Sequence, residues 1–125
     1  MNRHLICAVL VLSLTYGAHG IPIAGAQAPL ADAQRDYNGG RYDRAVDAAV
    51  GAIAKSPNDA ALHFLLGQSY FQLREFTRAI ASLERAVQLA PRQSEYHDWL
   101  GKAYGRKAEE SMFLSAMGWA RKAHM

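Results

Sequence analysis

The chain of 125 residues has a single cysteine, Cys7, which lies close to its N-terminus. Residues 8–125 therefore offer no thiol, which excludes from them disulfides, thiolate metal sites and a cysteine nucleophile. Charges of one sign are also never concentrated, because the chain has no block of five or six like charges. The net charge of +3 gives little indication of nucleic acid binding, and we expect no nucleic acid partner.

Motifs of common catalytic and phosphate-binding sites are absent as well. The chain has neither a Gly-x-Ser-x-Gly nucleophile elbow nor a glycine-rich phosphate loop ending in Gly-Lys-Ser or Gly-Lys-Thr. His63 and His97 could share a metal ion in principle, but no third ligand follows at helical spacing, and zinc sites use three or four converging ligands. We therefore expect a protein that is not an enzyme and has no catalytic residues, metal site or cofactor.

Residues 1–26 have the pattern of a secretory signal peptide. A short basic start containing Arg3 precedes Leu5 to Leu14, which is almost wholly apolar but well below the roughly 20 residues of a membrane-spanning helix. Ala24-Gly25-Ala26 fits the small-x-small rule, so we expect cleavage after Ala26 and export to the periplasm or the medium. Cleavage after Gly20 and an uncleaved N-terminal anchor are the alternatives.

The remaining chain contains an internal sequence repeat. Its period of about 34 residues is typical of a helix–turn–helix unit stacked on copies of itself, which presents a surface for another molecule rather than a catalytic pocket. The prolines Pro57 and Pro91 and the alanines Ala45 and Ala79 follow the same offset. The clearest match is the string His63-x-x-Leu66-Gly67-x-x-Tyr70, which recurs as His97-x-x-Leu100-Gly101-x-x-Tyr104.

Apolar residues spaced by three and four positions predict a series of helices separated by turn residues. Gly39-Gly40, Pro57 and Pro91 interrupt the pattern, since proline cannot continue a helix and glycine favours turns. Asn58 or Asp59 is expected to cap the third helix. The predicted helices span 29–38, 42–55, 60–73, 76–89 and 94–107; residues 108–125 stay helix-prone, but the repeat pattern is lost there.

These residues resemble the tetratricopeptide repeat family, whose pattern is Trp-x-x-Leu-Gly-x-x-Tyr, then Ala, then Ala-x-x-x-Phe, then Pro. The resemblance covers residues 27–107, as repeats 27–59, 60–93 and a partial repeat 94–107. It implies an all-α superhelix of helix–turn–helix repeats. Repeat one departs from the pattern, with Ala33 in the glycine position and Asp36 in the tyrosine position.

The motif residues of this family have structural roles. Gly67 and Gly101 should let two helices approach closely, which offsets the cost of about 1 kcal/mol of a glycine inside a helix. Tyr70 and Tyr104 should fill the joints between neighbouring repeats. We expect none of these four residues to bind a partner.

The resemblance also implies that the first helix of each repeat lines a concave face, where a protein or peptide partner would bind. Phe64 and Phe71 occupy positions that the internal stacking does not require, so we expect them to be available to a partner. The alternative is that they serve only in packing. The expected partner-binding residues are Phe64, Gln68, Phe71, Gln72, Asp98 and Lys102.

Residues 108–125 are expected to form a C-terminal helix, for which two interpretations stay open. Its apolar residues form one broad stripe flanked by basic residues, which suits a membrane surface or a partner. It could also cap the open end of the stack, as repeat arrays require for solubility. The sequence thus predicts a non-enzymatic adaptor or scaffold in the cell envelope. The alternative is self-association as a homo-oligomer, or attachment to a membrane surface, through this helix.

Overall fold

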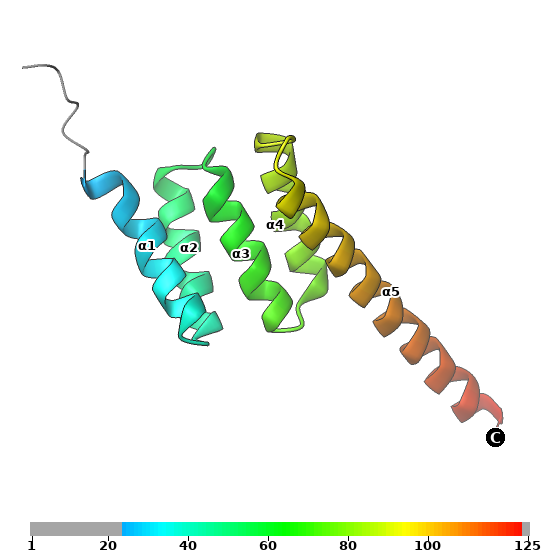
Figure 1. The fold of residues 1–125 in the computed structure, drawn as a ribbon. Coiled ribbons are helices and arrows are strands. Elements are labelled where there is room, and N and C mark those ends of the chain that lie inside the picture. The colour runs from blue at the N-terminus through cyan, green and yellow to red at the C-terminus, as the bar shows by residue number, and fades with distance from the viewer. Residues whose placement is uncertain (1–23, 124–125) are drawn as a thin grey trace, which may run out of the picture.

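The computed structural model describes residues 24–123, which form five α-helices with no β-strand among them. Figure 1 shows the helices following one another in one direction, with the last projecting beyond the others. The expected all-α fold is confirmed. Residues 1–23, most of the expected signal peptide, lie outside the described residues. The helices are α1 (Ala24–Asn38), α2 (Tyr42–Lys55), α3 (Ala60–Gln72), α4 (Phe76–Leu89) and α5 (Ser94–Ala123).

The helices form hairpins that stack side by side. Within the hairpins α1 packs on α2 and α3 packs on α4, and between repeats α2 packs on α3 and α4 on α5. The first helices of the repeats, α1, α3 and α5, also contact one another in sequence, whereas α2 and α4 do not touch. The stack therefore has an inner layer made of α1, α3 and α5 and an outer layer made of α2 and α4, as in a curved helical-repeat array.

The turn between the two helices of a repeat contains one residue in the left-handed conformation. Gly40 has a φ angle of 72° in the α1–α2 turn, and Arg74, at the same position of the next repeat, has a φ angle of 62° in the α3–α4 turn. Glycine adopts this conformation freely, whereas for other residues it costs about 1–2 kcal/mol. The turn geometry is therefore a property of the repeat and does not depend on glycine. Between repeats, Asp59 caps α3 as expected and accepts a hydrogen bond from the Ala61 amide at 3.0 Å.

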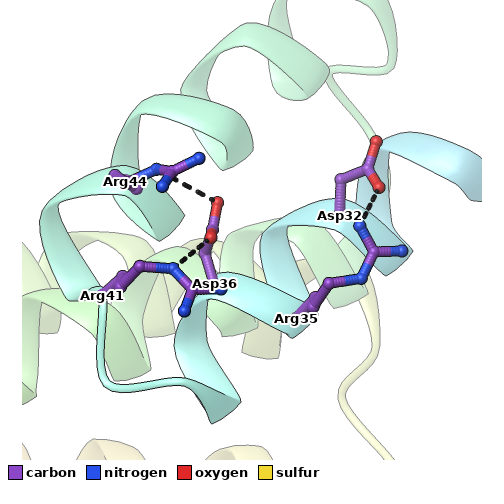
Figure 2. A network of polar contacts seen from close by, with 5 residues as sticks. All are labelled: Asp32, Arg35, Asp36, Arg41 and Arg44. Atoms are coloured by element: carbon purple, nitrogen blue, oxygen red, sulfur yellow. Dashed lines mark hydrogen bonds and ion pairs between the residues drawn. The ribbon is translucent and has the colours of Figure 1, made fainter.

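Asp36, which stands in the tyrosine position of repeat one, forms a polar link between α1 and α2 (Figure 2). Its carboxylate accepts a hydrogen bond from Arg41 Nε at 2.8 Å and lies 3.9 Å from Arg44 Nε. The hydrogen bond from Arg41 lowers the pKa of Asp36, burial opposes this effect, and the charge of Arg44 adds to the lowering. Repeat one thus replaces an aromatic contact with an ionic one at the same place.

Two buried clusters form the core, and Tyr70 of α3 packs against both of them. The aromatic ring of Tyr70 thus fills the joints that repeat two makes with repeat one and with repeat three, as the sequence predicts. Small side chains dominate the buried positions, which lets the helix backbones approach closely. The first cluster consists of Ala33, Ala49, Leu65 and Leu66, and the second of Ala79, Leu83 and Ala103.

The two motif glycines differ in their surroundings. At Gly67 a Cβ atom would lie 2.6 Å from Leu83 Cγ, so α3 and α4 touch there as expected. At Gly101 a Cβ atom would have nothing within 4 Å, so the expected close approach is wrong for this residue. Tyr104 is 48% exposed and donates a hydrogen bond to Glu84 of α4, so it contacts the preceding repeat but meets no following helix. The physical reason is that α5 has no second helix packed against this side.

Helix α5 continues without interruption from Ser94 to Ala123, where the sequence predicted a helix ending at residue 107 and a separate C-terminal one. Every residue from 111 to 123 is exposed, and this part of α5 extends past the stack in Figure 1. In this extended arrangement it does not cap the open end of the array. Good helix formers such as Ala108, Glu109 and Glu110 follow residue 107, and no proline or glycine separates them from it.

Candidate partner-binding surface

The inner layer contains all six residues that the sequence assigns to partner binding, but it does not bring them into one group. Phe64, Gln68, Phe71 and Gln72 belong to α3, while Asp98 and Lys102 belong to the first half of α5. Since α3 and α5 are neighbours in this layer, both sets lie on the same side of the stack. Their exposure and contacts differ strongly.

Three of these six side chains, those of Phe64, Phe71 and Lys102, converge on Trp99 of α5. The Phe71 ring meets the Trp99 ring edge to face at a centroid distance of 5.4 Å, and the Phe64 ring does so at 6.4 Å. Lys102 Nζ lies 5.1 Å from the centroid of the same indole ring, within reach of a cation–π interaction. Trp99 is not among the residues expected from the sequence, and its counterpart one repeat earlier is Leu65, which is only 1% exposed, so the repeat pattern alone assigns this position to packing.

Phe64 and Phe71 are half-buried and form part of the packing between α3 and α5. Phe64 stacks on Tyr96 with ring centroids 4.3 Å apart, and Phe71 also meets the ring of Phe76 at 5.5 Å. The expectation that internal stacking does not require these two aromatics is therefore wrong. They join repeats two and three in the way that Tyr70 joins its neighbours, since a partial third repeat must still be held by apolar contacts with α3.

Tyr96 belongs to the same aromatic group, and its contact with Phe64 changes the pKa of its phenol. Burial beneath Phe64 raises the pKa of Tyr96, and the negative charges of Asp59 and Glu95 raise it further. The hydroxyl group stays protonated at physiological pH and can donate a hydrogen bond.

Asp98 and Lys102 remain accessible beside this aromatic group. Both are exposed on the first half of α5, four residues apart, which places them on neighbouring turns of the same helix face. Lys102 rests on Trp99, so its charge is held near an aromatic surface. An ammonium group and a carboxylate beside an indole ring can hydrogen-bond to a peptide while the ring offers an apolar contact.

The two glutamines lie apart from Trp99. Gln72 is exposed at the end of α3, where its Nε2 donates a hydrogen bond to Tyr37 Oη of α1 at 3.3 Å. Gln68 is only 9% exposed, so it is part of the interior more than of the surface. Gln72 and Tyr37 therefore form a second polar position on the inner layer, between α1 and α3.

A shallow hollow of about 410 Å³ lies where α5 leaves the stack, next to the α3–α4 turn. The guanidinium carbons of Arg74 and Arg106 both lie 5.9 Å from the centroid of the buried Phe76 ring. Glu109, which pairs with Arg106 at 2.8 Å, balances part of their charge. The hollow combines charges of both signs with apolar side chains. Its lining residues are Arg74, Phe76, Arg106, Glu109, Glu110, Phe113 and Leu114.

The two motif histidines make the same local contact one repeat apart. His63 Nε2 lies 2.8 Å from the Pro57 carbonyl oxygen, and His97 Nε2 lies 2.8 Å from the Pro91 carbonyl oxygen. Because a carbonyl oxygen only accepts, each Nε2 carries the proton and donates it. Each histidine thus ties the start of a helix to the loop before it. Within residues 24–123, no three histidine, aspartate or glutamate side chains gather as a metal site would require.

Helix α5 has 30 residues, several of which are charged. Of the helices that the structure describes, none combines the length and the apolar character that crossing a membrane requires.

Known proteins resemble this chain over its repeat region. A family model described as tetratricopeptide repeat matches residues 30–94, from α1 to the first residue of α5. The rhomboid protease GluP of Bacillus subtilis (strain 168) is 30% identical to the chain over 111 residues, which are 85% of this chain and 22% of that protein. The chain thus matches about a fifth of the length of this relative.

Proposed function

Because the chain belongs to the tetratricopeptide repeat family, we propose that it is a non-enzymatic adaptor or scaffold that binds a protein or peptide partner in the cell envelope. Domains of this family generally mediate protein–protein interactions and typically have no catalytic activity. The match to a rhomboid protease covers too small a share of that protein for its protease activity to be carried over. The proposal concerns the repeat region alone.

The observation that carries the proposal is the exposed pair Asp98 and Lys102 on the inner layer, with Lys102 resting on the Trp99 ring. Both charged side chains are exposed, and Lys102 lies 5.1 Å from the indole centroid. Neither charged group is needed for the core, so their positions favour contact with another molecule. Gln72 extends the polar surface toward α1 through its hydrogen bond to Tyr37.

Site-specific photocrosslinking in the producing cell tests this surface. A photoreactive amino acid replaces Lys102 on the inner layer or, as the control, Ala81, which is exposed on the outer helix α4. We expect a discrete adduct with one protein from position 102 and none from position 81. Equal adducts at both positions, or an adduct at position 81 alone, would contradict binding through the inner layer.

The envelope location is a proposal from the sequence of residues 1–26. Cleavage after Ala26 would remove only the start of α1, from Ala24 to Ala26, and leave the packed part of that helix, which includes Ala33, in place. Cell fractionation followed by mass spectrometry tests it. We expect a processed chain that begins at Gln27 outside the cytoplasm, and an unprocessed chain confined to the cytoplasm would contradict the proposal.

A second candidate function is self-association or membrane-surface attachment through the free part of α5. It is favoured by the large apolar side chains exposed there, of which Met112 and Trp119 are each 73% exposed. Light scattering on a size-exclusion column and vesicle flotation, with and without residues 108–125, test it. A monomer that does not float in either form would exclude this candidate.

A further inference from the structure

The first half of α5 has an exposed face whose counterpart on α3 is covered by α4. A Cβ atom at Gly101 or at Gly105 would have nothing within 4 Å, and Tyr104 is 48% exposed. One repeat earlier the position of Gly101 is held by Gly67, which lies against Leu83 of α4. Repeat three therefore lacks the helix that covers this face in repeat two.

Residues 110–123 carry much of the apolar pattern of that missing helix, in register. Most residues that α4 packs inward have apolar counterparts one repeat later, and these counterparts are exposed on α5. Phe76 and the half-buried Val87 are the exceptions, since their counterparts are Glu110 and Arg121. Of the residues that α4 exposes, Thr77, Ala81 and Gln88 correspond to the polar residues Ser111, Ser115 and Lys122, whereas Arg78 corresponds to the apolar Met112. The apolar counterparts are Phe113 for Ala79, Leu114 for Ile80, Met117 for Leu83 and Ala120 for Ala86.

The sizes of the side chains that would meet in such a pair are also matched. In repeat two, Phe71 of α3 packs against a cluster of smaller side chains, Ala79 and Leu83 of α4 and Ala103 of α5. In repeat three the residues equivalent to Phe71 and Ala79 are Gly105 and Phe113, in which the sizes are exchanged. A packed interface tolerates such an exchange because the total volume is kept.

The straight helix keeps these two faces apart. The separation of Gly101 and Met117 along the sequence places them about 24 Å apart along the helix and about 160° apart around it. The straight α5 of a second copy of the chain could not cover both the Gly101 face and the Met117 face, because the two faces point in nearly opposite directions. A reversal of the chain would bring them together, as the α3–α4 turn does for Gly67 and Leu83, which have the same separation in sequence.

We propose that α5 is hinged at Ala108, and that residues 110–123 fold back onto the Gly101–Gly105 face as the second helix of repeat three. Ala108 holds the position of Gly40 and Arg74, the left-handed residues of the two existing turns. Arg74 demonstrates that this turn forms with a side chain present. The extended helix of Figure 1 and the hairpin are two arrangements of one segment, and the hairpin buries the exposed side chains of Phe113 and Met117.

A disulfide between two introduced cysteines tests the hinge in the full chain, with Cys7→Ser as the background. The variant carries Gly101→Cys and Met117→Cys, whose Cα atoms are too far apart in the straight helix for a bond that needs roughly 4.4–6.8 Å. The matched control carries Gly101→Cys and Ser115→Cys, since Ser115 lies near Met117 on the opposite side of the helix. Gly101, Met117 and Ser115 are all exposed, so the circular dichroism spectra of the reduced variants should match the spectrum of the parent.

We expect an intramolecular disulfide in the first variant, forming about tenfold faster than in the control. Adding Ala108→Gly should speed its formation by about fivefold, because glycine adopts the left-handed turn conformation freely and weakens the straight helix. The absence of an intramolecular disulfide, equal rates in the two variants, or no response to Ala108→Gly overturns the proposal. Covalently linked dimers in place of closed monomers also overturn it and assign the uncovered face to a second copy of the chain.

Discussion

The side chain of Leu83 lies directly over Gly67, so that a Cβ atom on Gly67 would fall 2.6 Å from Leu83 Cγ and 3.2 Å from the Leu83 backbone nitrogen. The backbone atom cannot move without shifting α4. We predict that Gly67→Ala lowers the free energy of unfolding by about 1–3 kcal/mol, as overpacking does in other cores. Urea denaturation followed by circular dichroism measures the change.

The control for this substitution is Gly51→Ala, in the exposed part of α2. A Cβ atom there would have nothing within 4 Å. Alanine should therefore raise the free energy of unfolding by up to about 1 kcal/mol through its higher helix propensity. If both glycine variants shift stability in the same direction, the contact between α3 and α4 is not what limits the size of residue 67.

The ion pairs of Asp36 predict how the α1–α2 hairpin responds to acid. Because its pKa is lowered in the folded chain, chiefly by the hydrogen bond from Arg41, the ionised carboxylate stabilises the fold above its unfolded pKa. This contribution is lost as the pH falls through the folded pKa. Asp36→Asn should therefore destabilise the chain at neutral pH, and the difference from the parent should shrink on acidification. Urea denaturation at a series of pH values measures it, and a difference independent of pH would argue against the ionic link.

Phe71 is predicted to be a packing residue, in contrast to Lys102. Phe71→Ala should lower the free energy of unfolding by about 3 kcal/mol, since the ring is lost from between Phe76 and Trp99. Lys102→Ala should change it by less than about 0.5–1 kcal/mol, because the side chain is exposed and contributes at most a cation–π contact. Thermal and urea unfolding compare the two. An unaffected Phe71→Ala variant would return this residue to the accessible surface.

The histidine contacts predict a graded effect along the array. His63→Ala should lower the free energy of unfolding by about 1 kcal/mol, because the half-buried ring loses its hydrogen bond to the Pro57 carbonyl oxygen. His97→Ala should have a smaller effect, since His97 is exposed and water can replace the ring. Equal losses in the two variants would show that exposure does not govern the strength of this contact.

Much of the array could be read from local signals in the sequence. Helix α2 (Tyr42–Lys55) and helix α4 (Phe76–Leu89) begin and end where the spacing and the turn residues predict, because each signal lies within a few residues of the boundary it sets. The cap at Asp59 follows from the same local logic. Helix α1 begins at Ala24, before Pro29, its expected first residue, and the local signals did not predict this start, because a proline usually stands in the first turn of a helix.

The candidate surface was harder to predict, because exposure depends on which helices are neighbours. Periodicity places Phe64 and Phe71 on the inner face, but only the position of α5 shows that Tyr96 and Trp99 cover part of their rings. Lys102 is exposed as expected, because a lysine side chain is almost never fully buried unless it is paired.

By itself the sequence determined the class of fold, the number of stacked units and the identity of the helices that line the inner layer, since a fixed repeat period can only be satisfied by like units packed in register. The tertiary structure decided which motif residues contact a neighbouring helix, as the repeat pattern implies, and which do not. A helix packs against Gly67 but none packs against Gly101, although the two share the motif residues around them, because a glycine leaves room for a neighbouring helix without providing that helix.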